Sequence, residues 1–344
     1  MVKRVYLDWN ASAPLSTGAI TAMKNSFSNF ANPSSIHFEG RTAKIAIEKA
    51  REKIAELLGL DSRYNIVFTS GATETAALAL NKKKIKCAPI EHECVKVWSD
   101  VSLNTTKEGK VEIDDPRNSS LQIANSETGI IQKIPSGIYF TDAVQAFGKI
   151  FINFSNFDFE FSAISSHKIG GPKGIGAIIF KDLGKIEPII KGGGQEFGAR
   201  SGTENLINIE GFVASIEDRI KEINCGSWDE IKLKRNYFEE MILNESNNTK
   251  VVGQNVSRLP NTSFLVTPGW KNDLQVATMD IEGFSISSGT ACSSGRKSKV
   301  TALINMGFSE YERDCAIRVS IGATTKKSDL EKFVLSWSSF RKKI

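Results

Sequence analysis

Apolar side chains recur at three-to-four-residue spacing between Gly40 and Gly59. This period places them on one face of a helix, and a glycine after the last of them is a common helix stop. The spacing therefore predicts an amphipathic helix over 40–59. Its apolar face is expected to comprise Ala43, Ala46, Ile47, Ala50, Ile54, Leu57 and Leu58.

A short β-rich run, Ile66 to Thr69, breaks at Ser70-Gly71 and continues as an alanine-rich segment. This order predicts a strand, a tight glycine turn and a helix. The first N–H groups of a helix have no partner within the helix, so its N-terminus is suited to hold an anion.

Further apolar runs have strand character and alternate with polar or helical stretches. Such alternation favours an α/β fold with an at least partly parallel sheet over an all-β sandwich. These further strands are expected at Leu121 to Ala124, Ile138 to Thr141, Phe161 to Ile164, and Gly176 to Phe180.

The periodicity becomes helical again from Asn205 to about Leu243, with an interruption at 225–227. The polar stretch 244–250 is the predicted boundary between two domains. We expect a large domain over 16–243 and a smaller one formed by 1–15 and 244–344. The smaller domain is expected to contain strands and short helices and to end in a helix near the C-terminus.

The chain has 344 residues, of which 40% are hydrophobic and 24% charged, and its formal charge is +5. The length predicts about two domains, and the charge is too small for a nucleic-acid footprint. We see neither a signal peptide nor an apolar run long enough to cross a membrane, so a cytoplasmic protein is expected. The 5 cysteines lack a CxxC pair, which argues against both a disulfide framework and a metal site.

Candidate chemistry follows two of the predicted strands. Lys168, in SSHKIGGPKGIG, comes after a strand and before several glycines, where a lysine can form a Schiff base. Asp142 and Gln145, in TDAVQ, follow another strand. A carboxylate beside a pyridine nitrogen keeps that nitrogen protonated, as pyridoxal 5′-phosphate (PLP) requires to act as an electron sink. The glycine turn before Ala72 and Thr73 would supply the phosphate site.

Taken singly, each of these features has an ordinary structural interpretation. A lysine in a glycine loop usually faces solvent, Asp142 could cap a helix, and the SGAT segment could be only a turn. Because all three follow strands in one chain, their joint occurrence favours the cofactor site.

The sequence resembles the cysteine desulfurases, fold-type I PLP enzymes of the class V aminotransferase group. The resemblance runs nearly end to end. It is carried by YLDWNASAP, NPSSIHFEGR, IVFTSGATE, the EH pair at 91–92, NSETG, TDAVQAFGK, SSHKIGGPKGIG, GGGQEFGARSGTEN and SSGTACSSG. It implies a large domain with a mainly parallel sheet flanked by helices, and a smaller α+β domain.

The resemblance also implies a role for each matching residue. Lys168 would be the Schiff-base lysine, Asp142 the partner of the pyridinium nitrogen, Gln145 the contact to the phenolic oxygen, and His92 the residue stacked on the ring and a proton carrier. The phosphate would be held by Ala72, Thr73, Ser165 and His167, and by Thr203 of the neighbouring subunit, which implies a homodimer. Ser126 would lie near the cofactor, and Asn125 and Arg318 would bind the substrate.

Cys292, in ISSGTACSSGRKS, is surrounded by small and polar residues, which predicts an exposed loop. The resemblance makes it the nucleophile that takes sulfur from L-cysteine as a persulfide and leaves L-alanine. The sulfur would go to a protein acceptor, for iron–sulfur cluster assembly or other sulfur-containing molecules. The other four cysteines are expected to be small buried side chains. His37 is expected to have a structural role and to orient the loop in which it lies.

Three differences from the usual family pattern stand out. Ser126 replaces a second asparagine, the segment SIGATT lacks an arginine after its glycine, and 93–141 is compact. The alternatives are selenocysteine lyase or another class V PLP enzyme, and a catalytically silent PLP-fold scaffold. A dehydrogenase is disfavoured because no GxGxxG follows the first strand.

Overall fold

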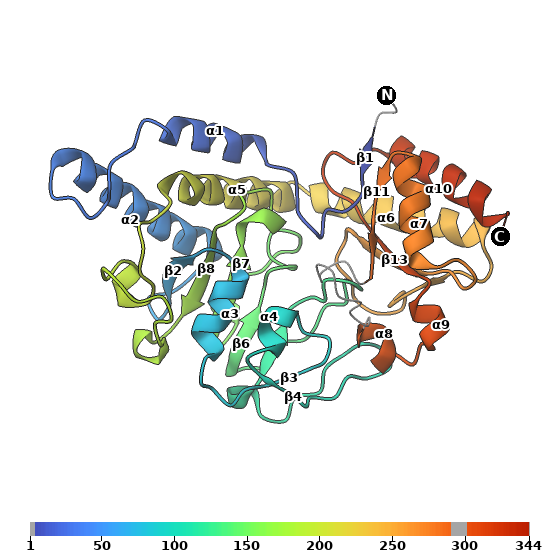
Figure 1. Ribbon diagram of the computed structural model, residues 1–344, viewed down its shortest axis with the longest axis horizontal. Coiled ribbons are helices and arrows are strands. Elements are labelled where there is room, and N and C mark those ends of the chain that lie inside the picture. The colour runs from blue at the N-terminus through green and yellow to red at the C-terminus, as the bar shows by residue number, and fades with distance from the viewer. Residues whose placement is uncertain (1–3, 290–300, 344) are drawn as a thin grey trace.

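A five-stranded mixed sheet organises the larger lobe of the computed structural model, which describes residues 4–289 and 301–343 (Figure 1). Four of its strands run the same way, and only β8, the last of the five along the chain, is antiparallel to its neighbours. In spatial order the strands are β2 (Asn65–Thr69), β8 (Gly176–Phe180), β7 (Phe159–Ser165), β6 (Ile138–Asp142) and β5 (Ser120–Gln122). The five predicted strands and the mainly parallel sheet are thereby confirmed.

Both faces of this sheet are buried, which explains the continuous apolar runs in β2 and β8. Successive side chains of a strand point to opposite faces. Val67 and Ile178 accordingly pack in one apolar core, whereas Phe68 and Ile179 pack in another on the opposite face.

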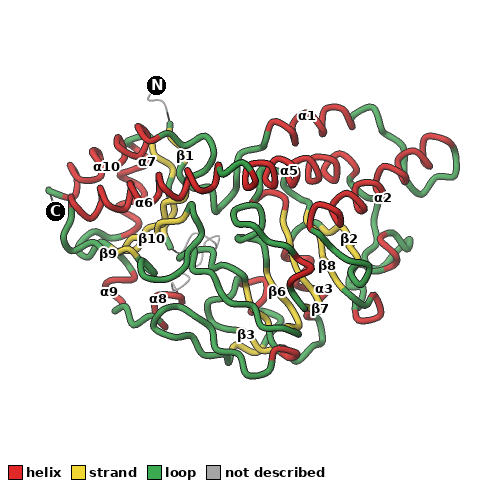
Figure 2. Tube along the Cα trace, turned by 180° about the vertical axis from the view of Figure 1, so that it is seen from behind, coloured by secondary structure: helices red, strands yellow, loops and turns green. Residues whose placement is uncertain are grey.

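Helices cover the two faces (Figures 1 and 2). One face carries α2 (Phe38–Leu58) and α5 (Leu206–Asn224), with α1 (Thr17–Ser26) packed along α5; the other carries α3 (Ala72–Leu80) and α4 (Glu93–Lys96). The helix predicted over 40–59 begins two residues earlier because the ring of His37 caps it by accepting from the Gly40 N–H group. It ends where Gly59 adopts a left-handed φ of 66°.

The second lobe is built on a four-stranded antiparallel sheet. Its strand order is β12 (Ser287–Ser288), β13 (Ala316–Ser320), β10 (Thr262–Val266) and β9 (Lys250–Val251). The N-terminal strand β1 (Val5–Tyr6) pairs in parallel with β11 (Phe284–Ser285). Its helices are α6 (Ser227–Glu245), α7 (Asn272–Ile281), α8 (Thr301–Asn305), α9 (Glu310–Arg313) and α10 (Lys327–Arg341).

Shorter elements complete the chain. A two-stranded parallel pair joins β3 (Lys86–Cys87) to β4 (Asp100–Val101). The 3-10 turns are η1 (Pro116–Asn118), η2 (Phe154–Asn156), η3 (Ser166–Lys168), η4 (Leu183–Lys185) and η5 (Glu196–Gly198). No described helix has both the length and the apolar character needed to cross a membrane.

The apolar core of the second lobe draws on distant parts of the chain. It joins Leu7 near the N-terminus to Trp270, Trp337 and the buried face of α6, which includes Phe238. The helical segment predicted over 205–243 is therefore two helices, interrupted near Cys225 as expected, with α6 packed in the second lobe. We propose a two-domain division on this basis, with α6 counted with the second lobe instead of with 16–243.

We predict that Trp337→Ala destabilises the protein by about 3–5 kcal/mol, because truncating a buried aromatic side chain removes its contacts and leaves a cavity. The Trp337 side chain is 0% exposed and its ring centroid lies 5.8 Å from that of Trp270. Leu335→Ala, on the same helix at a position that is 71% exposed, is the matched control and should cost little. Urea unfolding followed by tryptophan fluorescence measures both, and equal costs for the two variants would contradict the prediction.

Candidate active site

A cavity of about 580 Å³ opens at the carboxyl ends of the parallel strands. Its wall is formed where β2 turns into α3, where β6 ends at Asp142, and where β7 ends at Ser165. Open α/β sheets usually bind ligands at this edge. Predicted cofactor residues that line it are Ala72, Thr73, His92, Ser126, Asp142, Gln145, Ser165, His167 and Lys168.

Lys168 ends the single turn η3, which directly follows β7. Its Nζ donates to the backbone carbonyl oxygens of Asn10 at 2.8 Å and Ala11 at 2.9 Å. The N-terminal segment YLDWNASAP therefore reaches across to the sheet edge and orients the amine. An amine held in this way at a cavity wall is suited to bond an aldehyde.

Asp142, the last residue of β6, is buried and lines the same cavity. One carboxylate oxygen accepts from the Val144 N–H group at 2.8 Å, and the other has no hydrogen bond to any described residue. Burial raises the pKa of Asp142, although the charges of His92 and Lys168 oppose this effect. A pyridinium N–H at this carboxylate would supply the cationic partner that a buried acid needs.

His92 is the N-cap residue of α4, and capping fixes its ring. Its Nδ1 accepts from the Cys94 N–H group at 3.2 Å and lies 2.9 Å from the Cys94 Sγ atom. Because Nδ1 accepts, the neutral ring carries its proton on Nε2. Cys94, expected only as a buried thiol, is buried and also lines the cavity. The sequence signal for this placement was that Cys94 lies two residues after His92, at the N-terminus of a helix.

The N-terminus of α3 is suited to hold a phosphate. Gly71 caps the helix without a side-chain hydrogen bond, so the first N–H groups face the cavity region unassisted. Ser165 and His167 lie in the same wall. Burial, with the charges of Lys168 and Lys173, lowers the pKa of His167 to about 4, so it is a neutral hydrogen-bonding group at pH 7.

Other predicted residues do not line the cavity. Asn125 uses its side chain in a turn, accepting from the Glu127 and Thr128 N–H groups and donating to the Ile90 carbonyl oxygen. Thr203 is exposed in the loop that precedes α5. Cys292 lies outside the described residues.

Arg318 also lies behind the cavity wall. Its guanidinium donates to Asp8 at 2.8 Å and to the carbonyl oxygen of Ser126, a cavity residue, at 3.0 Å. The Nε atom of Arg318 is buried without a hydrogen-bond partner among the described residues.

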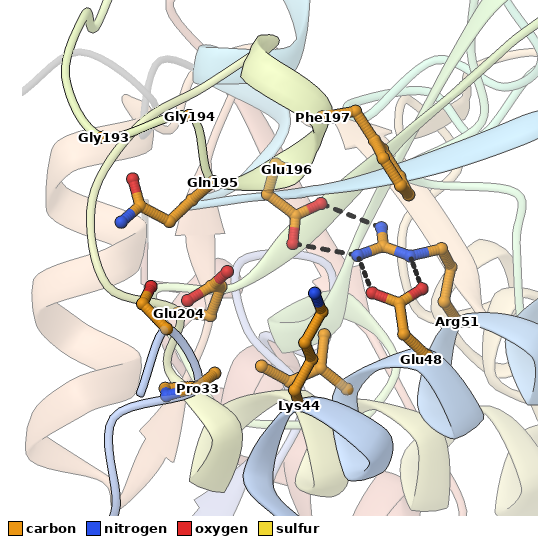
Figure 3. Close-up of a pocket in the computed structure, with 12 residues that line it drawn as sticks. Pro33, Lys44, Glu48, Arg51, Gly193, Gly194, Gln195, Glu196, Phe197 and Glu204 are labelled. Carbon is orange, nitrogen blue, oxygen red and sulfur yellow. Dashed lines mark hydrogen bonds and ion pairs between the residues drawn. The ribbon is translucent and has the colours of Figure 1, made fainter. Parts of the chain in front are cut away.

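A smaller cavity of about 230 Å³ lies beside the loop that carries Thr203 (Figure 3). The Glu196 carboxylate there accepts from Arg51 at 2.8 and 3.1 Å and from the Phe68 N–H group at 2.8 Å. The Arg51 guanidinium also lies over the rings of Phe68 and Phe197. These contacts tie the loop to α2 and β2.

The burial of the described cysteines agrees only in part with the sequence-based expectation. Cys87, Cys94 and Cys315 are buried, as expected. The expectation was wrong for Cys225, which is exposed because it lies at the turn between α5 and α6. A hydrogen bond with Ser227 lowers the pKa of the Cys225 thiol.

The mixed sheet, with a lysine, an aspartate and a helix N-terminus suited to a phosphate at one cavity, is the arrangement of a fold-type I PLP-dependent enzyme. The aminotransferase class-V family model matches residues 5–333. The chain belongs to this family and, within it, to the cysteine desulfurases, which depend on PLP.

Individual relatives cover almost the whole chain. Cysteine desulfurase IscS of Dictyoglomus turgidum is 35% identical over 96% of this chain and 92% of its own length. The structure of a NifS-like protein from Rickettsia africae has a TM-score of 0.89 and 31% identity, covering 98% of this chain and 99% of that one. A structure of SspA in complex with cysteine has a TM-score of 0.74 and 29% identity, covering 92% and 98% respectively.

Glu91, next to His92, is a buried acid whose ionisation depends on the fold. One of its oxygens accepts from the Gln122 N–H group at 2.6 Å. Burial, and to a lesser extent the Asp142 charge, raises the pKa of Glu91 to about 8. The folded protein thus keeps a proton on Glu91 at pH values where the unfolded chain has lost it.

We predict that this proton stabilises the fold below the ordinary pKa of glutamate, and that the stabilisation is lost as the pH rises through about 8. Glu91→Gln, which is neutral at every pH, should therefore lose less stability than wild type between pH 5 and pH 9. Urea midpoints across this range test the difference. Glu93→Gln, at an exposed neighbouring position, should keep the wild-type slope; an unchanged slope in Glu91→Gln would refute the assignment.

Proposed function

We propose that this protein converts L-cysteine into L-alanine and takes up the sulfur as a persulfide on Cys292. The observation that carries the proposal is the convergence of Lys168, Asp142 and His92 on one cavity at the sheet edge, in a chain related to cysteine desulfurases. The persulfide sulfur would pass to a protein acceptor, for iron–sulfur clusters or other sulfur-containing molecules.

When bound, PLP supplies an electron sink for negative charge that develops at the substrate Cα. Lys168 Nζ would hold its aldehyde and, once displaced by the substrate amine, would move the Cα proton. Asp142 would keep the pyridine nitrogen protonated. The buried Asp142 carboxylate, with one oxygen unpartnered among the described residues, fits that requirement.

His92 and Gln145 would orient the ring, and Ser126 would lie close to it. His92 Nδ1 accepts from the Cys94 N–H group, so the proton of the neutral ring is on Nε2, and we propose that this proton serves the reaction. The phosphate would accept from the N–H groups at Ala72 and Thr73, and from Ser165 and His167.

Sulfur transfer requires Cys292 as a thiolate. Its sulfur would form the new S–S bond with the substrate sulfur, and the electron pair of the broken C–S bond would remain with the substrate β-carbon. That carbon then takes up a proton and becomes the methyl group of alanine. The sulfane sulfur stays on Cys292 until an acceptor thiol removes it.

We propose that Arg318 and Asn125 bind the substrate carboxylate. A guanidinium fork suits this task, and the buried Nε donor of Arg318 has no acceptor among the described residues. The Asp8 carboxylate compensates the Arg318 charge while no substrate is present.

A homodimer is proposed because Thr203, a proposed phosphate ligand, does not line the cavity of its own chain. Thr203 is exposed, and the loop around it borders the segment at Pro33 and Ser34. Three large apolar side chains near that segment, Phe30, Ile36 and Phe38, are exposed in the single chain. Such a patch fits a second copy that would receive Thr203.

A reducing, cytoplasmic setting is proposed for the same protein. The cysteines within the described residues are all free thiols, and a persulfide on Cys292 would persist only where it is not first oxidised.

We predict that Cys292→Ala lowers alanine formation from L-cysteine by at least about 100-fold, because loss of a catalytic nucleophile removes the step that breaks the C–S bond. Cys225→Ala is the matched control, since Cys225 is an exposed thiol with a lowered pKa outside the cavity. Lys168→Ala should lose both turnover and the absorbance of the bound cofactor. Alanine formation by Cys292→Ala at the wild-type rate would refute the nucleophile, and normal turnover by Lys168→Ala would refute the cofactor site.

We predict that two defective chains restore each other when mixed. Lys168→Ala abolishes a chain's own site, whereas Thr203→Glu places a carboxylate beside the phosphate of its partner's site. Random mixing should recover about one quarter of wild-type activity, because half of the dimers are mixed and each mixed dimer has one intact site. Thr203→Ser should remain active. Activity no greater than the average of the two separate variants would exclude the shared site.

A further inference from the structure

The buried side chain of Lys149 lies behind the wall of the cavity. It is 2% exposed, and its Nζ donates to Gln145 Oε1 at 2.7 Å and to Asn10 Oδ1 at 2.8 Å. Lys149 itself is not part of the cavity wall, but Gln145 is. No ion pair involves Lys149 within residues 4–289 and 301–343.

The Gln145 carboxamide has a determined orientation because its two ends meet different partners. The Lys149 Nζ atom donates to the amide oxygen, and an amino group can donate whether or not it is charged. At the other end, Nε2 donates to the Asn10 backbone carbonyl oxygen at 3.0 Å, and that carbonyl only accepts. Nε2 carries two hydrogens, which leaves one for a group in the cavity.

Several hydrogen bonds also fix the side chain of Asn10. Its side-chain oxygen also accepts from Asn261 at 3.1 Å, and its Nδ2 donates to Thr262 Oγ1 at 2.9 Å. The Asn10 backbone carbonyl oxygen accepts from both Gln145 and Lys168. Lys149 and Lys168 are therefore joined through one residue of the N-terminal segment.

Stability of the fold does not explain Lys149. A buried charge without an anion is costly, and an apolar side chain of similar length is often neutral or better for folding. Burial, together with the charges of Lys168, Arg318 and Arg219, lowers the pKa of Lys149 well below its ordinary value. What Lys149 contributes is therefore its two hydrogen bonds, which hold the side-chain amide oxygens of Gln145 and Asn10.

We infer that Lys149 is a positioning residue that holds the Gln145 carboxamide with its Nε2–H group, and not its oxygen, toward the cavity. The inference rests on the proposed function, in which Gln145 contacts the phenolic oxygen of PLP. An N–H donor stabilises negative charge on that oxygen, whereas an amide oxygen turned toward it would repel that charge.

The test replaces Lys149 by methionine, which has similar length and no donor. We expect the pH midpoint of the cofactor absorbance in Lys149→Met to rise by about one unit, since loss of the donor favours the protonated form. The dissociation constant of PLP should rise about tenfold, as expected for a weakened hydrogen bond. Lys110→Met is the matched control, because Lys110 is a half-buried lysine that donates to the Ile131 carbonyl oxygen away from the cavity. Its midpoint should not move.

A second pair of variants separates amide orientation from the charge of Lys149. If Lys149 acts through Gln145, Gln145→Ala should shift the midpoint as Lys149→Met does, and the double variant should shift it no further. A full additional shift in the double variant, or a wild-type midpoint in Lys149→Met, would overturn the inference. If Lys149→Met does not fold, Lys149→Leu, which also has no donor, takes its place, with the same expected shift.

Failure of the inference is distinguishable from failure of the proposed function. A wild-type protein that binds PLP without making alanine, or that binds no PLP at all, would refute the proposed function whatever Lys149 does. A wild-type protein that does both, beside a Lys149→Met variant with unchanged absorbance and PLP affinity, would refute only the role of Lys149.

Discussion

The parallel pairing of β6 with β7 is the constraint on which the site depends. Their register places Asp142 opposite Ala163, so the two strands end side by side. Asp142 is the last residue of β6, and η3, which contains Lys168, directly follows β7. Because both faces of the sheet are buried, neither strand can slip in register without moving a row of large apolar side chains to the wrong face. The core therefore fixes the separation of the acid and the amine.

The electrostatics of the site follow from its burial. Lys149, Lys168 and Arg318 lie close enough that the positive charges of the latter two lower the pKa of Lys149. Asp142 and Glu91 are buried acids whose pKa values burial raises. A phosphate, a phenolic oxygen and a substrate carboxylate would bring negative charge to this cationic region, which suits the cofactor and substrate class of the family.

The N-terminal segment connects the two lobes at the site. Asn10 contacts Lys168, Gln145 and Lys149 of the large lobe, and its amide also bonds Thr262 and Asn261 of the second. Movement between the lobes would therefore act directly on the amine and the carboxamide. Asp8 in the same segment pairs with Arg318, so the proposed cofactor and substrate contacts share one support.

The sequence by itself determined the elements and most of the cavity wall. Periodicity located the five strands of the large sheet and the helix that His37 caps, because local burial patterns follow the period of each element. Motifs that follow strands brought Lys168, Asp142 and Thr73 together, since parallel strands end at one edge. The tertiary structure alone decided the packing of α6 in the second lobe and the contacts of Asn10 with Gln145 and Lys149. Those contacts join residues far apart in the chain, and no local spacing encodes which amide faces which donor.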